Sequence, residues 1–300
     1  PVDGLADAYC TSILRDQRGQ MWIGTEGGFS FFENGQLTSV NMVNGLPNNW
    51  VRCMLAINEK EMLVGTRSGL VQFNSQTKDL KKNKNKELSG KNVAALIKNQ
   101  DGDILIGADD TVYSLDSKNQ IRKIFSLTEG IIPTKKEPPV PLLISGIIED
   151  KNKTLWILTR ENAYTDSPDD IGRVFRYKDN SVSKWKLLGN EMLNPRVYQM
   201  EISAEDERWL ATNQGLIKIE KNGNYKRYTT KDGLFLDEVN LVYKSFDNSI
   251  WIGYASRGKN VISRLNADRI VHFIKLNNYA RAISPSIDGK MWIATAGNGL

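Results

Sequence analysis

The stretch Gln20-Met21-Trp22-Ile23-Gly24-Thr25 decides how this sequence is read, because close copies of it recur along all 300 residues. Seven copies are present, and each is anchored by a tryptophan or a leucine at its third position: Trp22, Leu63, Leu105, Trp156, Trp209, Trp251 and Trp292. Neighbouring anchors are 41, 42, 51, 53, 42 and 41 residues apart. A period of about 40 to 50 residues is typical of propellers and other repeat arrays.

Each copy follows an apolar segment and a polar turn. Twelve residues before each anchor stands an apolar residue: Cys10, Val51, Val93, Ile144, Val197, Val239 and Ala280. Between this position and the anchor lie clusters of Gly, Asn and Asp, which suit the positive φ angles of tight hairpins. The apolar runs are rich in β-branched and aromatic residues and show no helical period, so we predict that they are strands.

A third and a fourth strand are expected after each copy, at residues 28–32 and 36–40 in the first repeat. Four antiparallel strands per repeat make one propeller blade. We therefore predict an all-β fold, a seven-bladed β-propeller of four-stranded antiparallel blades, that forms a single domain over residues 1–300. The sequence ends at Asn298-Gly299-Leu300, where the third strand of the seventh blade should begin. We expect that blade to be incomplete and the parent protein to continue.

The anchors have a physical role in this arrangement, because sheets that pack face to face need bulk at their interface. Two positions after the anchor stands a small residue that lets the neighbouring sheet approach: Gly24, Gly65, Gly107, Ala211, Gly253 and Ala294. Leu158 occupies this position in the fourth repeat. The fourth blade is therefore expected to pack differently.

The two long spacings arise from extra residues in three segments, 126–142, 161–173 and 187–195. These segments join a fourth strand to the next first strand, or a second strand to a third. Both kinds of connection emerge on the same face of a propeller, so we expect the insertions to gather on one face over blades three to five. Long loops in compact domains are usually functional or mobile.

Composition argues against several classes of function. The net charge is only +5, and the basic residues cluster only at 78–91, whereas nucleic-acid binding needs a concentrated basic face. The longest apolar run, 140–148, is far shorter than the roughly 20 residues that cross a membrane. Cys10 and Cys53 make no disulfide framework and read most simply as small buried residues, although a bridge between them stays open.

Hydrolytic and metal chemistry find little support in the sequence. His272 is the single histidine and reads as a surface or packing residue, so no zinc site or catalytic triad can be assembled around it. Residues 99–103 resemble the start of a calcium loop but lack its later ligands, and we predict a hairpin there. The carboxylate pairs Asp169-Asp170 and Glu205-Asp206 lie in expected loops. We predict no catalytic residue, no metal and no cofactor.

The residues that flank the start of each innermost strand vary, while the frame around them stays constant. In a propeller they would ring the mouth of the central channel. Aromatic faces beside Arg, Asn and Glu suit a sugar, whose CH faces stack while its hydroxyls need directed hydrogen bonds. The alternative is that they only fill the channel. The candidate ligand-binding residues are Tyr9, Trp50, Arg52, Arg196, Tyr198, Glu238, Asn240, Tyr279 and Arg281.

The repeat resembles that of the two-component regulator propeller family. The clearest match runs from Gly4-Leu5 through Asp16 and Gly19 to the opening stretch, and the seventh repeat carries it again at residues 288–295. Leu63 and Leu105 depart from the family pattern, which has tryptophan at the anchor. The family motif is structural, so it transfers no binding residue.

The resemblance implies a sensor rather than an enzyme. Such propellers form the periplasmic sensing region of hybrid two-component histidine kinases, ahead of further domains, a membrane span and cytoplasmic kinase modules. It implies an oligosaccharide or similar polar ligand, further domains of the same chain and a homodimeric receptor, with no nucleic acid and no membrane contact in these residues. The alternatives are a structural or protein-interaction propeller and, less favoured, a propeller lyase.

Overall fold

The computed structural model describes residues 4–33, 35–82, 86–129, 142–160, 173–185, 195–203, 205–254, 260–266, 269–285 and 290–300. These residues are almost wholly β-structure. The helices among them are three 3-10 turns of three residues each: η1 (Met42–Asn44), η2 (Lys86–Leu88) and η3 (Thr230–Asp232). Within these ranges, no helix is long and apolar enough to cross a membrane.

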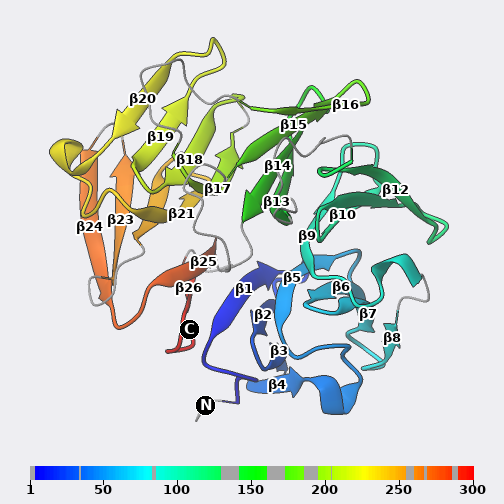
Figure 1. Cartoon of the computed structure of the whole chain (residues 1–300). Coiled ribbons are helices and arrows are strands. Elements are labelled where there is room, and N and C mark those ends of the chain that lie inside the picture. Colours follow the sequence, from blue (N-terminus) through cyan, green and yellow to red (C-terminus); the bar gives the residue numbers. More distant parts are fainter. Residues whose placement is uncertain are drawn as a thin grey trace, which may run out of the picture. The chain divides into compact units, whose positions relative to one another are not determined.

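The strands form sheets that follow the order of the chain (Figure 1). The sheets of the first three repeats are β1 (Cys10–Arg15), β2 (Met21–Thr25), β3 (Gly28–Glu33) and β4 (Gln36–Val40); β5 (Val51–Ala56), β6 (Glu61–Thr66), β7 (Gly69–Asn74) and β8 (Leu80–Lys82); β9 (Val93–Lys98), β10 (Ile104–Ala108), β11 (Thr111–Leu115) and β12 (Ile121–Ser126). The next three are β13 (Leu143–Glu149), β14 (Leu155–Arg160), β15 (Val174–Lys178) and β16 (Ser181–Lys184); β17 (Val197–Ile202), β18 (Arg208–Thr212), β19 (Gly215–Ile219) and β20 (Tyr225–Tyr228); β21 (Val239–Lys244), β22 (Ile250–Tyr254), β23 (Asn260–Asn266) and β24 (Arg269–Leu276).

The prediction of an all-β propeller of four-stranded antiparallel blades is confirmed, but the described residues form six such blades, not seven. The seventh repeat forms a two-stranded sheet of β25 (Ala280–Pro285) and β26 (Met291–Thr295). Every anchor lies in the second strand of its repeat, as the sequence pattern predicts.

Contacts divide the chain into two compact units. Unit 1 comprises Pro1–Leu96, Ala255–Ile262 and Ile274–Leu300, and unit 2 comprises Ile97–Tyr254 and Ser263–Phe273. The expectation of a single domain over residues 1–300 stays a prediction.

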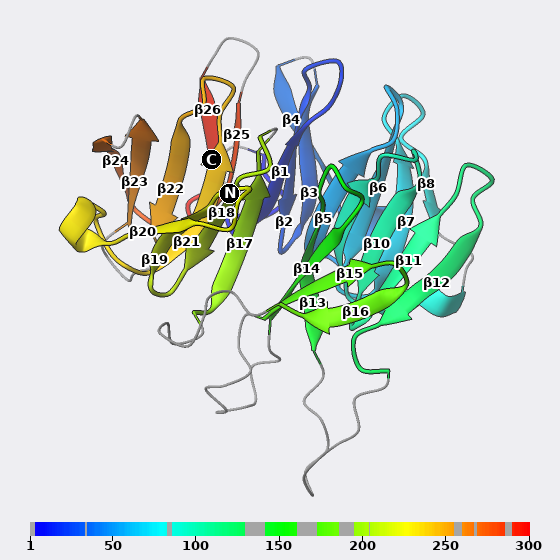
Figure 2. The ribbon, with the colours of Figure 1, turned by 90° about the horizontal axis from the view of Figure 1, so that it is seen from above.

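Within unit 1, the first and the last repeats lie side by side. The strand β25 packs against β1, and β1 packs against β5 (Figure 2). Tyr9 forms an isolated antiparallel bridge with Ala296, and the amides of Gly297 and Gly299 both donate to the carbonyl of Ala8. Within unit 2, β13 and β14 pack against β17, and β17 and β18 pack against β21.

The threonine and the glycine of the repeat close the turn between the second and third strands. Thr25 Oγ1 donates to the carbonyl of Gly28 at 2.8 Å and accepts from the amide of Gly27 at 3.1 Å. Gly28 has φ +139°, and a Cβ there would lie 2.2 Å from the carbonyl oxygen of Val40 on the neighbouring strand. Only glycine fits at residue 28, and Gly69 and Gly215 take the same position with positive φ in the second and fifth repeats.

The small residue after the anchor lets the next blade approach, as predicted. A Cβ on Gly24 would lie 2.4 Å from Ser12 Oγ and 2.9 Å from Val51 Cγ1 of the second blade. In the fourth blade the sizes are exchanged, because buried Leu158 pairs in register with Gly146. A glycine on the first strand therefore makes room for the leucine on the second.

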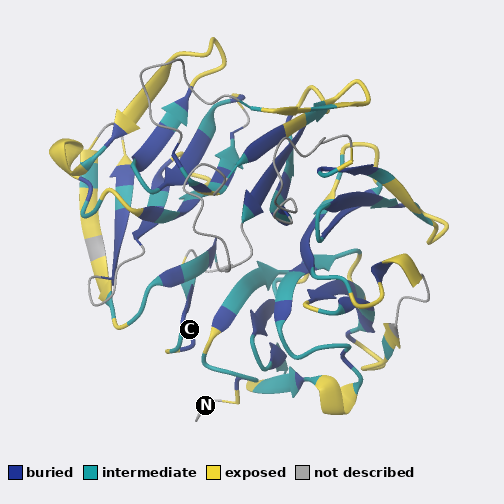
Figure 3. Cartoon of the chain, in the orientation of Figure 1, coloured by how far each residue is buried: buried dark blue, intermediate teal, exposed yellow. Residues whose placement is uncertain are grey.

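Aromatic bulk fills the space between the first two blades. Trp22 packs on Phe31 with ring centroids 4.6 Å apart, and Phe73 of the second blade meets Phe29 at 5.1 Å. All four rings are buried. Burial falls from the inner strands to the outer ones, as β18 and β20 show in Figure 3.

Other predictions made from the sequence can be compared with the structure. Residues 99–103 form the predicted hairpin, in which Asn99 Oδ1 accepts from the amide of Asp103 at 2.8 Å. Both cysteines are free, so the alternative of a bridge between Cys10 and Cys53 is wrong. Most of the three insertions, together with Asp169-Asp170, lies outside the described residues.

Candidate functional site

One backbone hydrogen bond recurs at the start of four innermost strands, β1, β5, β17 and β25. The residue after the repeat threonine donates its amide to the carbonyl of the residue that precedes the innermost strand. The pairs are Glu26 with Tyr9 at 3.1 Å, Arg67 with Trp50 at 3.0 Å, Asn213 with Arg196 at 3.2 Å and Ala296 with Tyr279 at 3.1 Å. In these four repeats the end of the second strand is thereby fixed beside the start of the first strand. We call these residues, with the predicted ligand-binding residues beside them in the same unit, the strand-start surface of that unit.

In unit 1 the strand-start surface contains Tyr9, Trp50, Arg52, Tyr279 and Arg281. Tyr9 is 50% exposed, so its ring is open to solvent. Arg281 donates to the hydroxyl of Tyr279 at 3.0 Å and lies 3.9 Å from the carboxylate of Glu26. A tyrosine ring, a guanidinium and a carboxylate therefore meet between β1 and β25.

Trp50, which also lies on the strand-start surface of unit 1, contacts two arginines. The guanidinium of Arg67 lies 4.8 Å from the centroid of the Trp50 ring, and that of Arg52 lies 5.9 Å from it, which are cation–π distances. Among the described residues, the buried indole Nε1 of Trp50 has no hydrogen-bond partner. An unsatisfied buried donor is unusual in folded proteins and calls for an explanation.

In unit 2 the strand-start surface contains Arg196, Tyr198, Glu238 and Asn240. The Tyr198 hydroxyl donates to Glu238 at 3.1 Å, which joins β17 to the start of β21. Burial and the charge of Glu238 raise the pKa of Tyr198 to about 12, although Arg196 acts in the opposite direction. The phenol therefore stays protonated at neutral pH and keeps its hydroxyl as a donor.

The structure places all nine predicted residues at the start of an innermost strand, five in unit 1 and four in unit 2. It brings together Tyr279 with Arg281, Trp50 with Arg52, and Tyr198 with Glu238. Their role in binding stays a prediction. The sequence analysis missed Glu26, Arg67 and Asn213. The sequence did contain a pattern that could have identified them: the residue after the nearly constant threonine varies from repeat to repeat.

The arrangement offers directed hydrogen bonds and aromatic faces. Among the residues that the structure describes, no group of three or more His, Cys, Asp or Glu side chains could hold a metal ion. His272 lies on the outermost strand β24, with Nδ1 2.7 Å from Ser263 Oγ and its ring against Phe235. It is exposed to solvent and packs on Phe235, in line with the surface or packing role expected from the sequence.

Comparison with known families supports the resemblance that the repeat shows. The family described as "Two component regulator propeller" matches residues 4–27, so that resemblance is confirmed. No curated protein matches this sequence.

Comparison with solved structures supports the fold. Two extracellular domains of hybrid two component systems from B. thetaiotaomicron are similar to the chain, with TM-scores of 0.75 and 0.72 and identities of 20% and 15%. The alignments cover 98% of this chain but 39% and 38% of those chains, so it spans about two fifths of their length.

A third similar structure is that of an enzyme. It is a catalytically inactive virginiamycin B lyase from Staphylococcus aureus with quinupristin, at a TM-score of 0.69 and 15% identity. The alignment covers 98% of this chain and 94% of the lyase. Likeness at these identities shows a shared fold, so function has to be argued from the residues of this chain.

Proposed function

We propose that this chain is a ligand-sensing propeller from the extracytoplasmic, periplasmic region of a hybrid two-component sensor. Its ligand is an oligosaccharide, and its readout is a cytoplasmic histidine kinase in a homodimeric receptor. The match to the regulator propeller family and the likeness to extracellular domains of hybrid two component systems support the sensor role. In this proposal the chain itself catalyses no reaction.

The observation that carries the proposal is the chemistry of the strand-start surface. Half-exposed rings such as Tyr198 stand beside guanidinium and carboxylate groups that are already oriented by hydrogen bonds. Such groups can stack on the CH face of a sugar and hydrogen-bond to its hydroxyls without reorganising, which lowers the entropic cost of binding.

We further propose that residues 1–300 form one propeller in which β25 and β26 are the inner half of a seventh blade. Trp292 and Ile293 are half-buried, whereas the equivalent Trp22 and Ile23 are buried. The outer edge of β26 therefore suits two more strands, because an unpaired edge beside apolar side chains favours strand addition.

Binding to a panel of oligosaccharides, measured by calorimetry, tests the ligand role. Tyr198→Ala should weaken binding at least about tenfold, because it removes both the ring and the donor to Glu238. Tyr225→Ala is the matched control, since Tyr225 is a 46% exposed tyrosine on the outer strand β20. Equal affinities for both variants and the wild type would favour a purely structural propeller, and turnover of a bound sugar would favour a lyase.

A further inference from the structure

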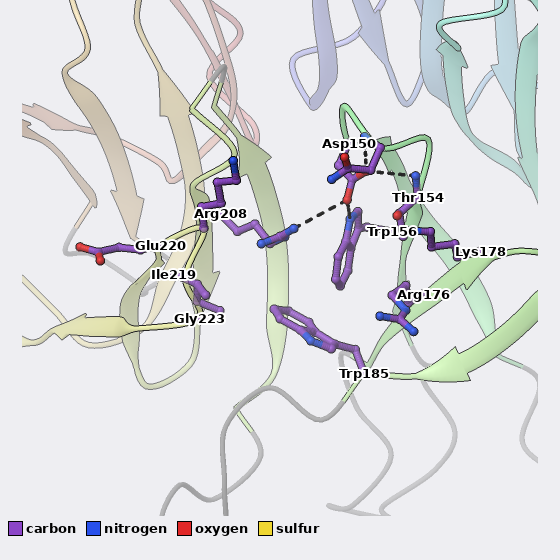
Figure 4. A pocket seen from close by; sticks show the side chains of 12 residues that line it. Asp150, Thr154, Trp156, Arg176, Lys178, Trp185, Arg208, Ile219, Glu220 and Gly223 are labelled. Atoms are coloured by element: carbon purple, nitrogen blue, oxygen red, sulfur yellow. Dashed lines mark hydrogen bonds and ion pairs between the residues drawn. The ribbon is translucent and has the colours of Figure 1, made fainter.

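A pocket of about 340 Å³ lies in unit 2 between the fourth and fifth blades. Its walls include the β13–β14 hairpin with Asp150, the ring of Trp156 on β14, Arg176 and Lys178 on β15, Trp185 after β16, and Arg208 at the start of β18 (Figure 4). The hairpins of these blades lie at the opposite end of the strands from Arg196 and Tyr198. The pocket is therefore separate from the strand-start surface.

Two changes from the first pair of blades open this space. Arg176 pairs in register with Trp156, whereas Phe31 pairs with Trp22 in the first blade and packs on its ring. Ile219 lies ten residues after its anchor, the position at which Phe73 fills the interface between blades one and two. Removing two phenylalanine rings from the same interface leaves room that the remaining side chains do not fill.

Asp150 and Trp156 line the pocket and are held in place by a hydrogen bond to each other. Asp150 Oδ2 accepts from the indole of Trp156 at 3.0 Å and lies 3.6 Å from the guanidinium of Arg208. Burial alone would raise the pKa of Asp150, but these partners and two hairpin amides outweigh it and lower that pKa. The carboxylate is thereby ionised, and the guanidinium of Arg208 beside it offsets its negative charge toward an anion in the pocket.

Three side chains of the pocket can contact a ligand: the ring of Trp185 and the cations of Arg176 and Lys178. Trp185 is half-buried and meets Trp156 edge to face, with centroids 4.8 Å apart. Arg208 covers the ring of Trp156 at 4.7 Å. Arg176 and Lys178 are exposed, and within the described residues neither forms an ion pair with a carboxylate. The lining also includes Glu220, an exposed residue whose carboxylate points away from the Trp156 ring in Figure 4. The pocket thus offers an aromatic wall beside the positive charges of Arg176 and Lys178.

We propose that this pocket binds an anionic sugar residue, a uronate or a sulfated pyranose. Its volume falls within the range of about 300–1,000 Å³ that ligand pockets occupy. The Trp185 ring would stack on the sugar face, and Arg176 could hold a carboxylate or a sulfate with two parallel hydrogen bonds. The site is carried by residues other than those of the proposed sensing surface, so neither proposal depends on the other.

Titration of the whole chain by NMR, observed at the tryptophan indole signals, tests the proposal. The probes are glucuronate, glucose 6-sulfate, glucose and inorganic sulfate. We expect saturable shifts of the Trp185 signal with either anionic sugar, and at least about tenfold weaker binding of glucose. Arg176→Gln should weaken the anionic sugars at least about tenfold, as the loss of one charge-assisted hydrogen bond predicts. The double variant Arg176→Phe and Ile219→Phe should abolish binding, because two phenylalanine rings would fill the pocket as Phe31 and Phe73 fill the interface between blades one and two.

Two control variants complete the test. Arg122→Gln removes an exposed arginine on β12 of the same unit and should leave the titration unchanged. Tyr198→Ala should also leave it unchanged, so failure here is distinguishable from failure at the strand-start surface. Equal binding of glucose and glucuronate, equal binding of inorganic sulfate, no saturable shift, or an unaltered affinity in Arg176→Gln would each overturn the proposal.

Discussion

At the scale of single residues, Asp16 shows what an aspartate six residues before the anchor does in the first and fourth repeats, the two that carry it. One carboxylate oxygen accepts from the amides of Arg18 and Gln20, both at 2.9 Å, and the other accepts from the indole of Trp22 at 3.1 Å. The same side chain therefore closes the hairpin and satisfies the anchor. In the fifth repeat a serine, Ser203, takes this position, and among the described residues the indole of Trp209 has no hydrogen-bond partner.

Replacing Asp16 by alanine should therefore cost more than replacing an ordinary hairpin aspartate. Asp116 accepts from two hairpin amides in the same way but bonds to no tryptophan. We expect Asp16→Ala to lower the free energy of unfolding by about 2–3 kcal/mol and Asp116→Ala by about 1 kcal/mol, because only the first leaves a buried indole donor unsatisfied. Urea denaturation measures both, and equal losses would contradict this role of Asp16.

The buried carboxyl of Glu201 should make the stability of the fold depend on pH. It lies on β17 in register with Trp209, and burial raises the pKa of its carboxyl from 4.5 to about 7. Between these values the folded chain binds more protons than the unfolded one, so the contribution of this group to stability falls as the pH rises from 4.5 to 7. The charge of Glu201 also contributes to a raised pKa of Tyr243, after the larger effect of burial there.

The variant Glu201→Gln should remove this fall. Relative to the wild type, we expect it to gain on the order of 2 kcal/mol in unfolding free energy between pH 4.5 and pH 8. Denaturation curves across this range provide the measurement. The control is Glu205→Gln, because the partner Lys244 and other hydrogen bonds lower the pKa of Glu205 to about 2, below the tested window. If the difference in unfolding free energy between the wild type and Glu201→Gln does not change with pH, the raised pKa of Glu201 is refuted.

At the scale of elements, the turn between the second and third strands should be the least tolerant part of a blade. Gly215 and Gly223 both have positive φ, +119° and +90°, in the same blade. A Cβ at Gly215 would lie 2.2 Å from the carbonyl of Tyr228, whereas none of the surrounding atoms lies within 4 Å of a Cβ at Gly223.

Replacing each of these two glycines by alanine distinguishes two effects. At Gly223 the alanine adds only backbone strain, whereas at Gly215 its Cβ also collides with the neighbouring strand. Gly223→Ala should cost about 1 kcal/mol, the usual penalty of a left-handed alanine, and Gly215→Ala should cost at least about 3 kcal/mol or prevent folding. Thermal unfolding of both variants is the measurement. Similar melting temperatures would show that the contact with β20 does not hold the turn.

The sequence predicted these elements well, because its signals were local. The expected third and fourth strands of the first repeat, residues 28–32 and 36–40, lie within a residue of the observed ends of β3 and β4. The pairing of Gly146 with Leu158 was missed, since register connects positions that the repeat pattern treats separately. The Trp156–Trp185 pocket was missed for the same reason: the insertion before β15 hides the equivalence of Arg176 and Phe31.

At the scale of the whole molecule, the strand-start residues could be predicted in position but not in chemistry. Their place follows from the repeat, yet the bond between Tyr198 and Glu238 and the stacking of Arg67 on Trp50 depend on contacts between blades or between strand ends. The proposal of a sensing surface therefore rests on the structure as much as on the sequence.

The most direct test of that proposal is the thermal unfolding of the 300-residue chain in the presence of an oligosaccharide panel. A ligand that binds only the folded state at 100 times its Kd adds about 2.7 kcal/mol, which raises the melting temperature by several degrees. We predict such a saturable rise with at least one oligosaccharide, and its loss in Tyr198→Ala but not in Tyr225→Ala. A melting temperature that no member of the panel raises, or a rise that Tyr198→Ala leaves intact, would contradict a sensing site on the strand-start surface.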